Sequence, residues 1–124
     1  MKFLFAEDDS KLHLIVRLWL QKNSMEMDSV FNGQEALRQL EEQDYDGLIT
    51  DVNMPLMNGI ELVRKVVKMD NCPSIIILLT SRCDLGQLKE EIDLSRVHLF
   101  NKPFSPAKLL ELIQELRPEV GANS

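Results

Sequence analysis

The sequence predicts a single α/β domain in which helices cover a parallel sheet of five strands. Short apolar segments alternate five times with segments of helical periodicity, and this alternation is typical of a parallel sheet with helices on its faces. The chain has 124 residues, of which 44% are hydrophobic, so it can bury the core of one domain but not of two. One domain therefore has to carry the function.

The predicted strands are five short segments rich in apolar residues. They are residues 2–6, 25–30, 47–51, 74–80 and 97–101. Residues 75–79 are apolar at every position, as expected for a parallel strand that is buried on both faces. We therefore expect this fourth strand in the middle of the sheet.

Helical periodicity fills the segments between the strands and after the last one. Apolar residues recur at i, i+3, i+4 and i+7 at Leu12, Ile15, Val16 and Trp19, and again at Leu109, Leu112, Ile113 and Leu116. Weaker stripes lie at Ala36, Leu37 and Leu40, at Ile60, Val63 and Val67, and at Leu85, Leu88 and Ile92. Candidate N-caps stand at Asn32, Asp84 and Ser105, and Pro106 suits a first helical turn. We expect the stripes to face the core.

Charge and composition limit the classes of partner. With 14 Lys and Arg against 20 Asp and Glu, the net charge of −6 disfavours direct binding of nucleic acid. No apolar run approaches the ~20 residues that span a bilayer, so we expect a soluble cytoplasmic protein without membrane contact. Cys72 and Cys83 lack the spacing of a metal site and are expected to be free thiols. We expect the domain to occupy residues 1–117, followed by a flexible tail or the start of a linker at 118–124.

Polar residues gather at the C-terminal ends of four predicted strands, which is the edge where open α/β sheets bind ligands. They are Glu7, Asp8 and Asp9 after the first strand, Asp51 at the end of the third, Thr80 and Ser81 at the fourth, and Lys102 and Pro103 after the fifth. Because right-handed crossovers bring these loops to one edge, we expect the four groups to converge.

The carboxylates in this group predict a magnesium site. Carboxylates that lie close together raise one another's pKa unless a cation compensates, and Mg²⁺ prefers oxygen ligands. Glu7, Asp8 and Asp51 meet this demand. The alternative is that residues 7–9 only place negative charge at the start of the first helix. Asp51 weakens that alternative, because a carboxylate that ends an apolar strand needs a partner of its own.

The same edge carries the groups for phosphoryl transfer. An aspartate can act as the nucleophile and form an aspartyl phosphate, while Lys102 offers a positive charge and Thr80 a hydroxyl donor. His13 and His98 have no neighbouring ligands, so we interpret them as packing or surface residues. Neither type of glycine-rich phosphate loop occurs, which disfavours nucleotide binding.

Four motifs in this order make the chain similar to the receiver domains of two-component response regulators. The motifs are FAEDD at residues 5–9, DVNMPLMNG at 51–59, LTS at 79–81 and NKPF at 101–104. The resemblance extends from Lys2 to about Arg117. It implies a flavodoxin-like, doubly wound fold with strand order 2-1-3-4-5 and five helices.

The resemblance also implies a mechanism. Asp51 would accept a phosphoryl group from a sensor histidine kinase or a phosphotransfer protein, and the domain would later hydrolyse its own acyl phosphate. Glu7, Asp8, Asp51 and the backbone carbonyl of Asn53 would hold Mg²⁺, while Thr80 and Lys102 would bind the phosphoryl group. The surface of the fourth helix, fifth strand and fifth helix would then shift and engage a downstream target, a fused output domain or a second copy in a homodimer.

Two departures from the family pattern lie away from the acidic residues. Leu99, with Phe100 beside it, stands where the family usually has Tyr or Phe, and residues 93–96 replace the usual Gly-Ala before the fifth strand. We therefore expect a variant route of signal transmission.

Two alternative functions are less well supported by the sequence. A Mg²⁺-dependent phosphohydrolase needs a second acid two residues after its nucleophile, and Asn53 occupies that position. A receiver that acts only as a binding module normally lacks the nucleophile, an acid or the lysine, all of which this chain retains. We therefore expect a signalling domain rather than a metabolic enzyme.

Overall fold

The computed structural model describes residues 1–81 and 85–116 and has one parallel sheet at its centre. Its strands are β1 (Lys2–Ala6), β2 (Glu26–Val30), β3 (Gly47–Asp51), β4 (Ile75–Thr80) and β5 (His98–Asn101). Their order is β2-β1-β3-β4-β5 with every neighbouring pair parallel, so the predicted sheet and strand order are confirmed. Our expectations for Cys83, the Asp84 cap and residues 118–124 lie outside the described residues.

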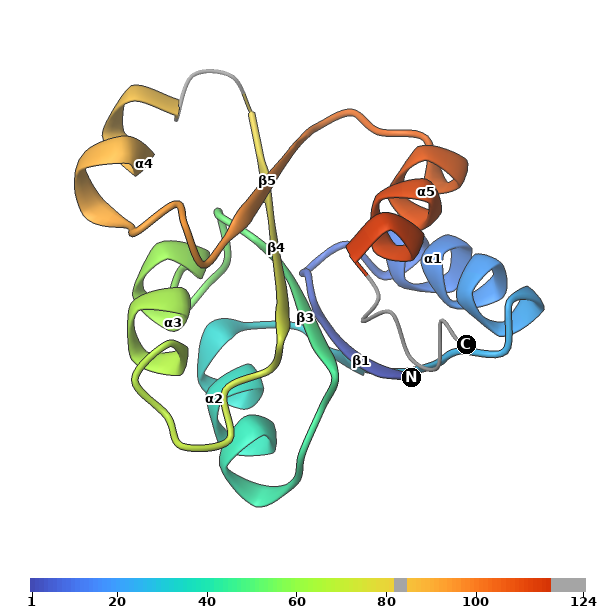
Figure 1. Cartoon of the computed structure of the whole chain (residues 1–124), viewed down its shortest axis with the longest axis horizontal. Helices are drawn as coiled ribbons and strands as arrows, with labels where there is room; N and C mark the ends of the chain where they lie inside the picture. The colour runs from blue at the N-terminus through green and yellow to red at the C-terminus, as the bar shows by residue number, and fades with distance from the viewer. Residues whose placement is uncertain (82–84, 117–124) are drawn as a thin grey trace.

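Helices pack on both faces of this sheet, as Figure 1 shows. One face is covered by α1 (Ser10–Lys22) and α5 (Pro106–Leu116), which lie side by side. The other face is covered by α2 (Gly33–Glu42), α3 (Gly59–Val66) and α4 (Leu85–Glu91). The fold is therefore doubly wound, and Pro106 begins α5 as predicted.

The strands divide the core into two clusters, because successive residues of a strand point to opposite faces. Phe3 and Phe5 of β1 pack in the cluster under α1 and α5, whereas Leu4 and Ala6 pack in the cluster under α2, α3 and α4. Every residue of β3 and β4 is buried. The predicted burial of β4 is thus confirmed, although β3 rather than β4 is the middle strand.

The buried face of α1 differs from the prediction. We expected Ile15 and Trp19 to face the core, but both are exposed, and His13, Val16 and Leu20 are buried instead. Apolar residues cover a broad arc of this helix, with a polar arc at Ser10, His13, Arg17 and Gln21, so periodicity alone could not select which part of the apolar arc is buried. Contacts with the rest of the fold select it, and they leave a large apolar strip exposed.

The helix starts place the residues of the sheet edge. Asn32 caps α2 as predicted by accepting a hydrogen bond from the Glu35 N–H at 2.8 Å. Asn58 and Glu61 form a capping box at the start of α3, which the sequence analysis did not predict. Gly59 lies directly against the backbone carbonyl of Asp51, where a Cβ atom would clash. Glycine therefore lets α3 begin close behind Asp51.

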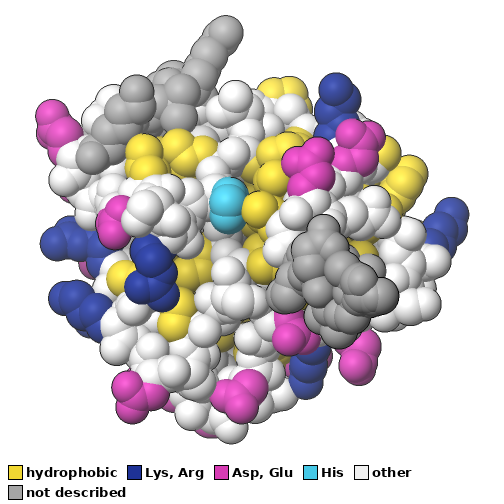
Figure 2. All heavy atoms as spheres, viewed as in Figure 1, with side chains coloured by type: hydrophobic (Ala, Val, Ile, Leu, Met, Phe, Trp, Pro, Cys, Tyr) yellow, Lys and Arg dark blue, Asp and Glu magenta, His cyan; other side chains and the backbone are white. Residues whose placement is uncertain are grey.

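On the face shown in Figure 2, several Lys and Arg side chains gather at the left, the side on which α3 lies in Figure 1. Elsewhere on that face, charged side chains of both signs are scattered among hydrophobic groups. In the part of the chain that the structure describes, no helix combines the length and apolar character needed to cross a bilayer.

Candidate functional site

Three carboxylates and one lysine meet at the C-terminal edge of the sheet, as predicted. Glu7 and Asp8 follow β1, Asp51 ends β3, and one oxygen of each lies within 4.8 Å of the others. Lys102 follows β5, and its Nζ lies 3.1 Å from Glu7 Oε1 and 3.2 Å from Asp51 Oδ2. The fold thus joins side chains that are up to 95 positions apart in the sequence.

The two innermost carboxylates are almost completely buried. Glu7 is 1% exposed and Asp51 is 6% exposed, whereas Asp8 is exposed. Burial raises the pKa of Glu7, and the nearby Asp51 raises it further. Burial likewise raises the pKa of Asp51, although the Lys102 ammonium opposes the shift. One lysine therefore does not fully compensate the two buried acids.

Lys102 remains the positive partner of this pair. Burial alone would lower the pKa of its ammonium, but Asp51 and Glu7 outweigh that effect, and the pKa lies above its usual value. The backbone of Lys102 is held too, since its N–H donates to the Thr80 carbonyl at 2.9 Å. The ammonium group is consequently both charged and anchored next to Asp51.

Thr80 and Asn53 complete the set of residues singled out from the sequence. Thr80 is buried at the end of β4, one residue beyond the Leu79 that pairs with Asp51, and its hydroxyl donates to the Ser81 carbonyl at 2.9 Å. The Val52 N–H donates to the Leu79 carbonyl at 3.1 Å, and the backbone of Asn53 and Val52 next to the Asp51 carboxylate opposes the rise in its pKa. Asn53 is exposed and, with Asp8, lines an open cleft beside the acids.

The donor set at this edge fits a hard divalent cation. All three convergent acidic groups offer oxygen atoms, which Mg²⁺ prefers over nitrogen or sulfur. The buried carboxylates lack sufficient positive charge, and the exposed Asp8 faces the open cleft through which an ion and its waters can reach them.

Nearly the whole chain matches one protein family. The family model described as the response regulator receiver domain matches residues 3–114. The chain belongs to this family. Transcriptional regulatory protein CutR of Streptomyces coelicolor is 28% identical over 116 residues, which cover 94% of this chain and 53% of CutR. The receiver domain thus spans about half the length of such a curated relative.

Solved structures agree with the family assignment. The chemotaxis response regulator CheY4 of Vibrio cholerae has a TM-score of 0.84 and 29% identity, covering 94% of this chain and 98% of CheY4. The response regulator TrrA of Thermotoga maritima, solved in complex with Mg(2+)-BeF, has a TM-score of 0.78 and 26% identity, covering 94% of this chain and 98% of TrrA. Both solved regulators therefore share this fold along nearly their whole length.

Asp9 has a different role from its two acidic neighbours. Its side chain accepts a hydrogen bond from the Lys11 N–H at 2.9 Å and caps α1. Capping by negative charge, which we considered as an alternative for residues 7–9, thus applies to Asp9. Its backbone N–H also donates to Glu7 Oε2 at 3.1 Å, so the cap helps to hold the neighbouring carboxylate.

His13 is a contact of the receiver site that the sequence analysis missed. Its ring is buried and its Nε2 lies 2.6 Å from the backbone carbonyl of Glu7. Burial lowers the pKa of His13. The sequence shows only that His13 lies about one turn into a helix that begins beside the acidic motif. It does not show that the ring of His13 contacts the backbone of Glu7.

The departure at Leu99 is not compensated by its aromatic neighbour. Leu99 packs against the cluster under α2, α3 and α4, whereas Phe100 packs in the other cluster and meets Phe104 edge-on at 5.7 Å between ring centroids. Adjacent strand residues point to opposite faces, so Phe100 cannot occupy the position of Leu99. The usual aromatic residue is therefore missing from that face.

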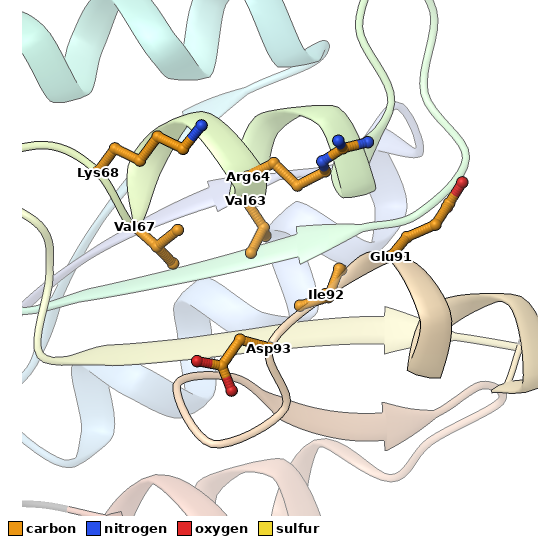
Figure 3. Close-up of a pocket in the computed structure, with 7 residues that line it drawn as sticks. All are labelled: Val63, Arg64, Val67, Lys68, Glu91, Ile92 and Asp93. Atoms are coloured by element: carbon orange, nitrogen blue, oxygen red, sulfur yellow. The ribbon is translucent and has the colours of Figure 1, made fainter.

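A second cavity of about 210 Å³ lies between α3 and the end of α4 (Figure 3). Val63, Val67 and Ile92 give it apolar walls, and its rim carries charges of both signs: Arg64 and Lys68 from α3 and its C-terminal extension, opposite Glu91 and Asp93. The opposite charges balance, so the cavity lacks the concentrated charge of the acidic edge.

Proposed function

We propose that this receiver domain accepts a phosphoryl group on Asp51 as part of a two-component phosphorelay. The observation that carries the proposal is the placement of Asp51: a buried carboxylate at the end of β3, in contact with Lys102 and within 4.8 Å of Glu7 and Asp8 ligand atoms. A carboxylate with a raised pKa and a lysine partner beside an open cleft is suited to act as a nucleophile toward phosphorus.

In the proposed transfer, an oxygen of the Asp51 carboxylate attacks the phosphorus of a phosphohistidine. A new P–O bond forms, the P–N bond breaks, and the imidazole nitrogen keeps the electron pair and takes up a proton. The Lys102 ammonium contacts the carboxylate before the transfer and would contact the phosphoryl oxygens after it. The Thr80 hydroxyl would donate to one of these oxygens. Glu7, Asp8, Asp51 and the Asn53 backbone carbonyl would hold Mg²⁺, which neutralises charge on the phosphoryl group.

The proposal includes the return reaction. Water attacks the phosphorus of the acyl phosphate, the bond to Asp51 breaks, and inorganic phosphate leaves with Asp51 again a carboxylate. Asn53 is exposed at the cleft beside Asp8, where an attacking water can arrive. The domain would thereby reset itself, as a timed signal requires.

The proposed output is a change in the surface formed by α4, β5 and α5. Lys102 connects this surface to Asp51, because the residue lies between β5 and α5 while its ammonium contacts the phosphoacceptor. A downstream protein, a fused output domain or a second copy of the chain would read the change. CutR, of which the domain covers 53%, is longer than the domain, which supports an output domain as one of these readers.

Labelling by a small phosphodonor tests the proposed site. Intact-mass spectrometry after incubation with acetyl phosphate should show a gain of about 80 Da that requires Mg²⁺. Asp51→Asn should abolish the gain, and Asp44→Asn, at an acid away from the site, should leave it unchanged. Full incorporation in Asp51→Asn would refute the assignment of Asp51.

We further propose that the protein phosphodonor docks on the exposed strip of α1. Leu14 and Leu18 are 59% and 50% exposed at i and i+4 on a helix that begins two residues after Asp8. The helix contains no acidic residue, and Lys11 and Lys22 lie near its two ends. Such a surface suits an acidic amphipathic helix of a histidine kinase or a phosphotransfer protein.

A charge placed on this strip separates docking from chemistry. Leu18→Asp should slow phosphorylation by the partner at least about tenfold while leaving labelling by acetyl phosphate unchanged. Gln34→Asp, which adds the same charge to α2, is the matched control. An equal loss of rate with both donors would show that the strip supports the site rather than the partner.

A further inference from the structure

His13 is held in a defined orientation inside the fold. Its ring lies between Phe5 of β1 and Phe31 after β2, with centroid distances of 4.7 and 4.6 Å. Its Nε2 lies 2.6 Å from the backbone carbonyl of Glu7. Its Nδ1 is buried and makes no hydrogen bond of ordinary geometry among the described residues, although the nearby Val30 backbone acts to raise the pKa of the ring. An apolar side chain could fill this space without burying an unpaired nitrogen, so packing alone does not account for a histidine.

The hydrogen bond to Glu7 acts on the turn that presents the acidic residues. The Glu7 backbone N–H donates to the Val30 carbonyl at 3.2 Å, and its Oε2 accepts from the Asp9 N–H at 3.1 Å. The carbonyl of Glu7 is the remaining polar group of this residue's backbone, and His13 is its partner. A carbonyl can only accept, so Nε2 carries the hydrogen.

Without this bond, a buried carbonyl would lose its partner at the peptide group that joins Glu7 to Asp8. The peptide group joining the two residues would then be free to rotate toward another donor, such as water, because a buried carbonyl without a partner is costly. Such a rotation would change the directions of the Glu7 and Asp8 side chains relative to Asp51.

We infer that His13 is a positioning residue of the acidic site, whose hydrogen bond to the Glu7 carbonyl orients Glu7 and Asp8 for Mg²⁺ binding. This inference rests on the proposed function, since it assigns His13 a role in the ion site on which phosphorylation of Asp51 depends. His13 does not touch the ion or the phosphoryl group. It acts through the turn between β1 and α1.

Two substitutions of similar size separate hydrogen bonding from packing. His13→Gln can place an amide N–H near the position of Nε2, whereas His13→Met fills comparable space without a donor. Isothermal titration calorimetry with Mg²⁺ alone, on the full chain, measures the effect without any phosphoryl transfer. We expect His13→Met to bind Mg²⁺ about 10-fold more weakly than the wild type and His13→Gln to bind within about threefold, as for outer partners of metal ligands.

Labelling by acetyl phosphate gives a second readout. The rate in His13→Met should return close to the wild-type rate once Mg²⁺ is saturating, so the defect lies in the concentration of Mg²⁺ required. Val16→Ala is the control, because it removes buried contacts from the same side of α1 and should lower the melting temperature without changing the affinity for Mg²⁺.

Each outcome decides the inference. Equal affinity in His13→Met and the wild type, or equal weakening in His13→Gln and His13→Met, would overturn it while leaving the phosphoacceptor role of Asp51 intact. A wild-type chain that binds no Mg²⁺ would overturn the proposed function as well. If the variants do not fold, ¹⁵N NMR of the wild-type ring decides: an Nε2–H tautomer whose signal moves on addition of Mg²⁺ supports the inference, and an Nδ1–H tautomer refutes it.

Discussion

The acidic edge of the sheet and the side formed by α4 and β5 are held in different ways. At the acidic edge, Glu7 and Asp51 are buried and each contacts Lys102 at 3.1–3.2 Å, so these three charged groups depend on one another. On the other side, the half-buried Leu99 contributes packing in the cluster under α3 and α4. Buried charges tolerate few substitutions, whereas apolar packing tolerates many, and both departures from the family pattern lie away from the buried charges.

The segment between α4 and β5 illustrates this tolerance. The residues that replace the usual Gly-Ala form a turn in which Asp93 accepts hydrogen bonds from the Ser95 N–H at 3.0 Å and the Ser95 hydroxyl at 2.6 Å. These bonds lower the pKa of the exposed Asp93. Residues 93–96 thus form a turn that is held by its own hydrogen bonds, and none of its described contacts reaches the acidic site.

The largest expected effect comes from removing the cation that joins the two regions. Lys102→Ala should lower the rate of labelling by acetyl phosphate by about 10²-fold, because one preorganised positive group at the phosphoryl oxygens is lost. Some phosphorylation should remain, but the phosphorylated variant should show little change in the NMR signals of α4 and β5.

Lys65→Ala, on the exposed face of α3, is the control for Lys102→Ala. A wild-type spectral change in the phosphorylated Lys102 variant would separate the lysine from signal transmission. It would leave the acidic edge as the only place where Lys102 acts.

A smaller effect concerns the stability of the acidic edge without metal. Burial raises the pKa of Asp51 and Glu7, so the fold favours the protonated form of each side chain. The resulting stabilisation is fully present at low pH and is lost as the pH rises through these raised pKa values. Asp51→Asn removes one buried charge. In EDTA at neutral pH it should increase the free energy of unfolding by roughly 1–3 kcal/mol, and the gain should shrink near pH ~4.

Urea unfolding at both pH values measures this difference, with the exposed Glu41→Gln as a control that should change little. A gain that stays the same at low pH would mean that the substitution acts through packing rather than through the charge of Asp51.

The smallest effect on the rate of phosphorylation is expected from a substitution on the side formed by α4 and β5. Leu99→Tyr restores an aromatic side chain on the face toward α3 and α4 and should leave the rate of acetyl phosphate labelling within about twofold of the wild type, with a stability change below about 1.5 kcal/mol. Its consequence should be confined to the NMR response of α4 and β5 after phosphorylation.

Phe100→Leu, which changes the neighbouring residue on the opposite face, is the control for Leu99→Tyr. A tenfold change in labelling rate in the Leu99 variant would mean that the acidic edge and the side formed by α4 and β5 are energetically coupled.

The sequence predicted the strands to within a residue at each end, because uninterrupted apolar runs such as that of β4 are typical of buried parallel strands. It also predicted that Glu7, Asp51 and Lys102 would lie at one edge, since the direction of a parallel sheet brings strand ends together. It could not predict the buried face of α1, because the apolar arc of that helix is broader than the part that is buried. Asn58 was missed as a cap, although the spacing of Asn58 and Glu61 is that of a capping box.

By itself, the sequence determined the order of the elements, the family and the identity of the acidic residues, all of which depend on local patterns and short motifs. Only the tertiary structure decided that His13 contacts the Glu7 carbonyl and that a single lysine reaches two buried carboxylates. Those facts depend on distances between side chains from different elements. Such distances arise when the helices pack on the sheet, and no local pattern in the chain encodes them.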